Sequence, residues 1–145
     1  MAEAVQQGQL HEVSELAAHV IPLLNRRFRP GGSGMGLGVR SALFALERHG
    51  PRRSGDLARL EGVAAPTMTR MMTALVERGH VARRPDPDDG RASLLEITEA
   101  GTEALSRARQ AYAEHIEEVL RELGPEELER VRGALTELVD AGLAD

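Results

Sequence analysis

Residues 55–101 read GDLARLEGVAAPTMTRMMTALVERGHVARRPDPDDGRASLLEITEAG, and this stretch decides the fold. The apolar residues at its start recur at helical spacing. Ser54, just before it, has the side chain that helix N-caps prefer. We therefore expect a short helix that is capped by Ser54 and buries Leu57 and Leu60. A glycine turn at residues 62–63 separates this helix from the next.

A longer helix is predicted over residues 65–79. Pro66 fits its first turn, where a missing N–H costs little, and Gly79 fits a left-handed C-cap. The two faces of the helix differ in character. The apolar face carries Met68, Met71, Met72 and Leu75. The polar face carries Thr67, Thr69, Arg70 and Thr73.

After Gly79 the sequence period changes from that of a helix to that of a hairpin. Residues 80–84 are extended, and residues 85–90 combine two prolines, three aspartates and a glycine, which is typical of a turn. Residues 91–97 form the return strand. Two helices joined by a turn and followed by a two-stranded hairpin indicate a winged helix-turn-helix. The fold class is thus mainly α with a small β-hairpin.

The polar face of the longer helix favours DNA binding. A helix fits the major groove, which is about 12 Å wide, and the N-terminal half of a recognition helix reaches the base edges. Arg70 suits a guanine or a phosphate, and the threonines suit phosphates or a thymine methyl group. The alternative is that these polar side chains only solvate an exposed helix face.

The hairpin adds further cationic groups. Its arginines are Arg83, Arg84 and Arg91. A guanidinium near a hairpin tip can enter a narrow minor groove, where the potential is most negative. Asp86, Asp88 and Asp89 are predicted to orient these arginines by bidentate pairing. The alternative is a simple solvated turn.

Residues 55–101 resemble the MarR family of transcriptional regulators. Residues 89–91 match the family's Asp-x-Arg wing element. Ile97, Thr98 and Gly101 match its Leu-Thr-x-x-Gly element. The resemblance implies a winged helix-turn-helix flanked by N- and C-terminal dimerisation helices. It also implies a homodimer that binds a pseudo-palindromic double-stranded DNA operator, usually as a repressor.

The resemblance assigns roles to individual residues. Recognition-helix roles fall on Thr67, Thr69, Arg70 and Thr73. Wing roles fall on Asp89 and Arg91. Three features depart from the family pattern. Gly90 stands where an arginine is frequent, Ala64 and Ala65 stand where a serine cap is common, and the glycine-rich residues 31–38 leave the spacing of the first two helices open.

Helices are also predicted on both sides of this core. Residues 10–29 form an amphipathic helix with Pro22 inside it, and residues 39–49 form a second helix whose buried residues include Phe44. Thr98 caps a helix that reaches about Leu123.

A last helix follows Gly124 and Pro125. We expect three parts: an N-terminal dimerisation helix and glycine-rich loop over residues 1–38, a winged helix-turn-helix over 39–97, and C-terminal dimerisation helices over 98–145.

The first and last helices carry apolar stripes with few residues able to form a separate core. Pairing with a second copy would bury both stripes. A two-fold dimer would place its recognition helices about 34–36 Å apart, one turn of the double helix. The alternative is that these helices pack only onto their own wing domain.

Charge is unevenly distributed along the chain. The net charge is −5, and all 18 basic residues are arginines. Residues 40–91 carry ten arginines and seven acidic residues, whereas residues 92–145 carry five and thirteen. A basic middle and an acidic end favour a duplex-binding module joined to a segment with a different partner.

Composition excludes several functions. Without cysteine, disulfides, thiolate metal sites and thiol redox sensing are ruled out. Three aromatic residues are too few for a single-strand stacking platform. No nucleophile motif, phosphate loop or carboxylate pair predicts an enzyme, and no cofactor is expected. No signal peptide or membrane segment is recognised, which favours the cytoplasm.

The resemblance also implies a small anionic or aromatic effector, bound between the dimer helices and the DNA-binding lobe. Its candidate contacts are His19, Leu23, Arg27, Leu46 and Tyr112. No metal is predicted, although Glu114 and His115 with a second copy's His11 are a conceivable zinc site. The alternative functions are a winged-helix protein-interaction module without operator recognition and a metal-responsive regulator.

Overall fold

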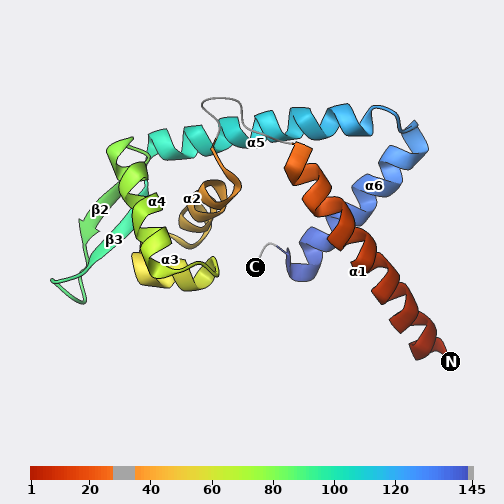
Figure 1. Ribbon diagram of the computed structural model, residues 1–145, viewed down its shortest axis with the longest axis horizontal. Coiled ribbons are helices and arrows are strands. Elements are labelled where there is room, and N and C mark those ends of the chain that lie inside the picture. The colour runs from red at the N-terminus through yellow and green to blue at the C-terminus, as the bar shows by residue number, and fades with distance from the viewer. Residues whose placement is uncertain (28–34, 144–145) are drawn as a thin grey trace. The chain divides into compact units, whose positions relative to one another are not determined.

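The computed structural model describes residues 1–27 and 35–143. Its elements are α1 Ala2–Arg27, α2 Leu37–His49, β1 Arg52–Arg53, α3 Ser54–Leu60, α4 Ala65–Glu77, β2 Val81–Pro85, β3 Ser93–Ile97, α5 Glu99–Leu120, α6 Pro125–Leu138 and the π-helical turn η1 Val139–Leu143 (Figure 1). Contacts divide the chain into two units. Residues 25–111 are the central unit, and residues 1–24 with 112–145 are the terminal unit.

The central unit is a winged helix-turn-helix, as the sequence predicts. Helices α2, α3 and α4 precede the β2–β3 hairpin, whose tip projects beyond them (Figure 1). The sheet is antiparallel with the strand order β1-β3-β2. Val81 pairs with Ile97 and Pro85 with Ser93, so β2 and β3 are in register along their whole length.

One aliphatic core holds the central unit together. Its largest fully buried side chains are Leu43, Leu46, Leu57, Met68, Met72, Leu75, Leu95 and Val81. They come from α2, α3, α4 and both hairpin strands, so the core fastens the helix-turn-helix to the wing. Burying one such side chain contributes about 1.5–3 kcal/mol, and this cluster therefore dominates the stability of the unit.

Thr98 joins the two ends of the wing. Its backbone N–H donates to the His80 carbonyl at 3.0 Å, and its hydroxyl donates to the Gly79 carbonyl at 2.6 Å. The same hydroxyl oxygen accepts the Gly101 N–H at 3.0 Å, which is the N-cap bond predicted for α5. Gly79 has a φ of +76°, which confirms the left-handed turn after α4. One threonine thus connects the end of α4, the start of β2 and the start of α5.

Gly101 lets this junction close. A Cβ at this position would lie 2.1 Å from the His80 carbonyl oxygen and 2.8 Å from Cγ1 of Ile97. No side chain fits there without moving the backbone. The Thr-x-x-Gly spacing seen in the sequence is therefore a packing requirement of the junction.

Several local expectations are corrected by the structure. The sheet has a third strand, β1, that was not predicted. Ser54 is the first residue of α3 and does not cap it; the N-cap is Arg53, without a side-chain hydrogen bond. Leu60 and Phe44 were expected to be buried but are 53% and 41% exposed. The Arg109 guanidinium lies over the Phe44 ring, 5.7 Å from its centroid.

Helix boundaries differ as well. α1 begins at Ala2 and runs through Pro22, whereas the apolar pattern placed its start at residue 10. Residues 28 and 29, which were assigned to this helix, lie outside the described residues, as does the loop at 31–34. α5 ends at Leu120, three residues before the expected Leu123.

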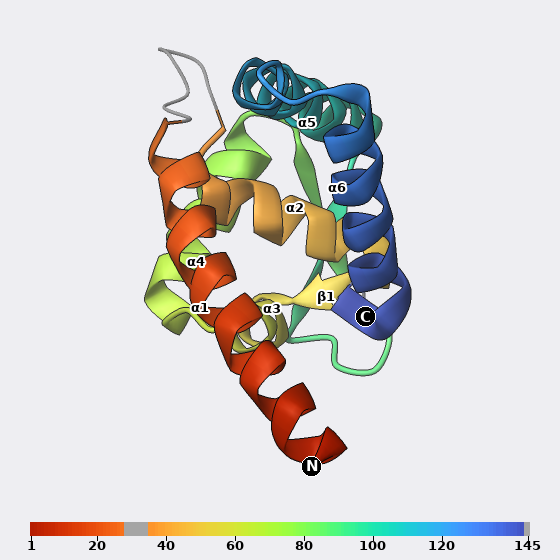
Figure 2. The same ribbon diagram turned by 90° about the vertical axis from the view of Figure 1, so that its right-hand side faces the viewer.

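The terminal unit leaves its apolar stripes uncovered. Leu10, Val13 and Leu16 of α1 are 58–65% exposed, and Leu135 of α6 is 57% exposed. α1 and α6 run apart from one another (Figure 2). Within the described side chains of these two helices, none is buried. The stripes therefore contribute little stability within a single copy.

The two units also differ in charge. The central unit contains 15 arginines and ten acidic residues, whereas the terminal unit contains three arginines and thirteen acidic residues. The structural division thus separates a basic unit from an acidic one. None of the helices in the described ranges combines the length and the apolar character needed to span a membrane.

We predict that Gly101→Ala destabilises the protein by about 1–3 kcal/mol, because the new methyl group meets the His80 carbonyl. Gly133→Ala in α6 is the matched control, since a Cβ there meets nothing within 4 Å. This control should instead stabilise by up to about 1 kcal/mol through helix propensity. Denaturant unfolding measures both. Equal effects of the two substitutions would contradict the packing role of Gly101.

Candidate nucleic-acid interface

Helices α3 and α4 form the helix-turn-helix. The turn between them contains Gly62 with a φ of +64°, and the Val63 N–H donates to the Ala58 carbonyl at 3.0 Å. Leu57 of α3 and Met68 of α4 are both fully buried and hold the pair against the core. The angle between the helices is therefore set by apolar packing beneath the turn.

The two faces of α4 divide as the sequence predicts. Met68 and Met72 are fully buried, Leu75 is 2% exposed, and Met71 is half-buried against the core. On the opposite side Thr69, Arg70 and Thr73 are exposed, and Thr67 is half-buried. The Thr73 hydroxyl donates to the Thr69 carbonyl at 2.9 Å, which leaves its oxygen able to accept a further hydrogen bond.

The start of α4 has no side-chain cap. Ala64 is the N-cap residue and its carbonyl accepts the Thr67 and Met68 N–H groups at 2.9 and 3.1 Å. Sequence reasoning did not include Ser54 in this region. Its hydroxyl oxygen lies 3.5 Å from that of Thr69, so the start of α3 adds a second hydroxyl beside the exposed face of α4.

The wing tip is built around Asp86. This residue is only 5% exposed, and its carboxylate accepts a hydrogen bond from Arg53 Nε at 2.5 Å. It also accepts the Asp88 N–H at 2.9 Å. The Arg53 contact, then the backbone N–H groups of Asp88 and Asp89, hold the pKa of the Asp86 carboxyl below its ordinary value. The tip is thus anchored to β1, 33 residues earlier in the chain.

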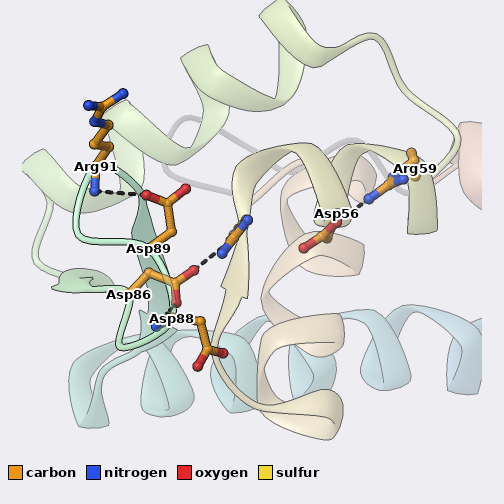
Figure 3. Close-up of polar contacts among 7 residues, drawn as sticks. Asp56, Arg59, Asp86, Asp88, Asp89 and Arg91 are labelled. Carbon is orange, nitrogen blue, oxygen red and sulfur yellow. Dashed lines mark hydrogen bonds and ion pairs between the residues drawn. The ribbon is translucent and has the colours of Figure 1, made fainter.

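Asp89 and Arg91 form a local turn at the same tip. Oδ1 of Asp89 accepts the backbone N–H of Arg91 at 3.0 Å (Figure 3). The Ala92 N–H donates to the Asp89 carbonyl at 2.9 Å, which closes the loop. The Arg91 side chain is exposed and extends from this fixed backbone.

These contacts correct the role predicted for the wing acids. Asp86 pairs with an arginine of β1, and Asp89 binds the backbone of Arg91 rather than its guanidinium. Arg84 forms an ion pair with Glu96 on the neighbouring strand. Asp86 and Asp89 therefore shape the loop that carries the wing arginines, and the guanidinium that Asp86 holds is that of Arg53.

Arg53 is a second residue that sequence reasoning missed. It occupies a two-residue strand, which is too short to show any periodicity. The only signal was the pair of arginines after Gly50 and Pro51, a feature with many possible explanations. Its partner became clear only when the fold brought β1 beside β3.

Comparisons with known proteins agree with this architecture. The MarR family model matches residues 41–93. An HTH-type transcriptional regulator from Mycobacterium bovis is 38% identical over 122 residues, which cover 83% of this chain and 85% of the relative. The chain belongs to the MarR family. It is a DNA-binding transcriptional regulator with a winged-helix fold.

Two further comparisons extend over most of the chain. An HTH-type transcriptional regulator from Mycobacterium leprae is 36% identical over 131 residues, covering 88% of this chain and 92% of the relative. The crystal structure of a transcriptional regulator from Thermotoga maritima is 26% identical with a TM-score of 0.67. The match covers 92% of this chain and 94% of the Thermotoga maritima chain.

The predicted effector residues of this MarR-family chain lie in different environments. His19 and Leu23 are exposed on α1, and Tyr112 is half-buried on α5. Leu46 is 1% exposed and belongs to the core of the central unit. The side chain of Arg27 lies outside the described residues. An effector site at these residues stays a prediction.

Across the described part of the chain, no three histidine, aspartate or glutamate residues are grouped to hold a metal ion.

The wing of this MarR-family protein should be sensitive to acid. The Asp86 carboxyl has a native pKa below its ordinary value of 3.8, so the unfolded chain binds more protons as the pH falls through that range. The stabilisation that the ionised Asp86 carboxylate gives the folded protein is present above about pH 4 and is lost as the pH falls toward the native pKa of Asp86. Asp86→Asn should remove this acid-dependent loss. Thermal unfolding between about pH 6 and pH 2 measures it.

Asp88→Asn is the matched control for this measurement. Asp88 is a neighbouring exposed aspartate, and its side chain lies apart from the Asp86 carboxylate (Figure 3). The control should keep the wild-type pH profile. If Asp86→Asn and the wild type lose stability in parallel as the pH falls, the anchoring role of Asp86 is wrong.

Proposed function

We propose that this chain is a homodimeric, ligand-responsive repressor that binds a pseudo-palindromic DNA operator in the cytoplasm. The observation that carries the proposal is the division of α4, with Met68 and Met72 fully buried on one face and Thr69, Arg70 and Thr73 exposed on the other. A helix held so firmly on one side offers a fixed polar surface on the other. This is the arrangement required of a recognition helix in the major groove.

Each exposed side chain has a distinct task in this proposal. Arg70 donates to guanine O6 and N7 or to a phosphate, and Thr69 and Thr73 contact phosphates or a thymine methyl group. Thr67 is half-buried and lies nearer the start of the helix, where it approaches the backbone of the duplex. Ser54 lies beside Thr69 and adds a hydroxyl for a phosphate.

The wing supplies the second set of contacts. Arg83 and Arg91 are exposed and reach into the flanking minor groove, where a cation is favoured. Arg84 must exchange Glu96 for a phosphate before it can take part, so its contribution is smaller. Asp89 acts indirectly, because its carboxylate fixes the backbone from which Arg91 extends.

Dimerisation through the terminal unit is supported by its exposed apolar residues. Leu16 of α1 and Leu135 of α6 are 58% and 57% exposed, and packing against a second copy would bury both side chains. A two-fold axis would repeat α4 at the spacing of two half-sites, about 34–36 Å. In this proposal the basic central unit carries the DNA contacts and the acidic terminal unit carries the dimer contacts.

Ligand response rests on the family comparison and on the residues assigned from it. Of these residues, His19 would contact an anionic group, and Leu23 and Tyr112 its apolar part; Leu46 is 1% exposed in the core, and the side chain of Arg27 lies outside the described residues. The function requires no catalytic step.

We predict that Arg91→Ala weakens DNA binding uniformly across sequences and lowers the salt slope by about one unit. Arg70→Ala should cost about 1–3 kcal/mol and relax the preference for one base pair, if it contacts a base edge. Shift assays on the DNA flanking the protein's own gene, repeated at several salt concentrations, measure both effects.

Arg130→Ala is the control for these variants. Arg130 is an exposed arginine of α6 whose partner is Glu127, and it lies in the acidic terminal unit. DNA affinity should not change when it is removed. If Arg70→Ala and Arg91→Ala bind as the wild type does, the docking of α4 and the wing is wrong. If the wild type lacks sequence-preferring binding, the protein-interaction alternative replaces the repressor.

We predict that Leu16→Glu and Leu135→Glu each dissociate the dimer. Each leucine occurs twice at a two-fold interface, so its loss costs about 3 kcal/mol or more, a change of over a hundredfold in Kd. Leu60→Glu is the control, since Leu60 is 53% exposed but lies on α3 of the central unit. Light scattering across a dilution series gives the mass. A wild-type monomer, or a control that also dissociates, would contradict the proposed interface.

A further inference from the structure

The β2–β3 hairpin carries an arginine on each of its two faces. Residues that lie directly opposite each other on paired strands share a face of the sheet. Arg83 lies opposite Leu95, which is fully buried, so Arg83 belongs to the face that covers the core. Arg84 lies opposite Leu94 and belongs to the outer face. Both arginines are exposed near the hairpin tip, and the wing therefore presents a guanidinium group on either side.

The arginines of the two faces differ in their ionic partners. On the outer face, Nε of Arg84 forms an ion pair with Oε2 of Glu96 on β3. Arg53 of β1 lies in the same cross-strand row as Arg84, and it is paired with Asp86. On the core-covering face, the Arg83 guanidinium has no carboxylate partner among the residues that the structure describes. The outer face is thus neutralised, whereas Arg83 keeps its charge available.

The environment of Glu96 holds Arg84 more firmly than an exposed carboxylate would. Oε2 of Glu96 is shielded from solvent and accepts no hydrogen bond from the described residues. The guanidinium of Arg84 therefore supplies the charge that balances this oxygen. Withdrawing Arg84 would leave a shielded negative charge without compensation, which costs more than breaking a solvated pair. The ion pair thus keeps the Arg84 charge on the protein.

We propose that Glu96 is a positioning residue that limits the sequence-independent affinity of the wing for duplex DNA. This role rests on the proposed function, which brings the hairpin tip to the minor groove. That groove is about 6 Å wide and has phosphates along both walls, so each face of the hairpin approaches one wall. Arg83 offers its charge to one wall, whereas Glu96 withholds Arg84 from the other. Because phosphate contacts carry no sequence information, this restraint lowers the affinity for every sequence alike.

Glu96→Gln tests this role, because it removes the charge of the carboxylate and keeps the size of the side chain. The released Arg84 would neutralise one more phosphate. The affinity for a random-sequence duplex should therefore rise about tenfold at low salt, and the slope of log K against log salt should steepen by about 0.9. Fluorescence anisotropy of the full-length protein with a labelled random-sequence duplex, at several salt concentrations, measures both quantities.

A double-mutant cycle with Arg84→Gln separates the release of Arg84 from the loss of a negative charge. Glu96→Gln should raise the affinity about tenfold when Arg84 is present. In the Arg84→Gln background it should raise the affinity only about twofold, since there the change acts through screened, long-range charge. Equal gains in the two backgrounds would overturn the role of Glu96.

Glu103→Gln is the matched control. Glu103 belongs to the central unit and is paired with Arg107 at 3.5 Å, so this substitution changes the net charge equally and also frees an arginine. The affinity for the random duplex should stay within about twofold of the wild-type value. An effect as large as that of Glu96→Gln would overturn the proposal. Thermal unfolding of every variant confirms that it is folded.

The same measurements distinguish this role from the proposed function. A wild type that binds operator and random duplexes equally would contradict the repressor, whereas the effect of Glu96→Gln on the random duplex would still support the role of Glu96. Sequence-preferring binding without any effect of Glu96→Gln would support the repressor and overturn the role of Glu96. If neither the wild type nor Glu96→Gln binds any duplex, both are wrong.

Discussion

The hydrogen bonds of Thr98 are the constraint on which the central unit depends. A single side chain donates to the carbonyl that ends the α4 turn and accepts the N–H that begins α5, at 2.6 and 3.0 Å. Its backbone N–H closes the base of the hairpin on His80. The missing side chain at Gly101 permits this approach, since a Cβ would lie 2.1 Å from the same carbonyl oxygen. The position of α4 relative to the wing is therefore fixed by the Thr98 hydroxyl and the backbone groups it joins, in addition to the shared aliphatic core.

The far end of the wing is held by charge. A projecting hairpin tip has few apolar contacts to order it, and its backbone would otherwise fray. The pair of Arg53 and the 5% exposed Asp86 replaces them, helped by the backbone N–H of Asp88. The wing is thus fastened at its base by Thr98 and at its tip by Arg53. Arg91 extends from a loop with two anchors, so the proposed contact with a duplex would require little ordering of the loop and would lose less affinity to conformational entropy.

Patterns within one element were readable from the sequence, whereas contacts between distant elements were not. The buried methionine face of α4 follows from helical periodicity, and Thr98 as a cap follows from its place before a long apolar pattern. β1 has two residues and hence no period, so its pairing with β3 and the Arg53–Asp86 contact 33 residues apart had no local signal. The apolar residues Phe44 and Leu60 satisfied the helical pattern yet are 41% and 53% exposed, because burial depends on a neighbour that periodicity does not specify. Sequence reasoning gave the wing acids a structural role but paired them with nearby arginines. Only the separation along the chain was known at that stage, and the separation in space was not.

Added salt should strengthen association through the terminal unit and weaken DNA binding by the central unit. The terminal unit has thirteen acidic residues and three arginines, so the proposed dimer would bring like charges together, and apolar burial would have to supply the association. Added salt screens that repulsion and favours the dimer. The central unit has 15 arginines and ten acidic residues, and its attraction to phosphates weakens as salt rises. A measured salt dependence of DNA binding therefore contains two opposed contributions, and only a protein concentration well above the dimer Kd isolates the contacts of α4 and the wing.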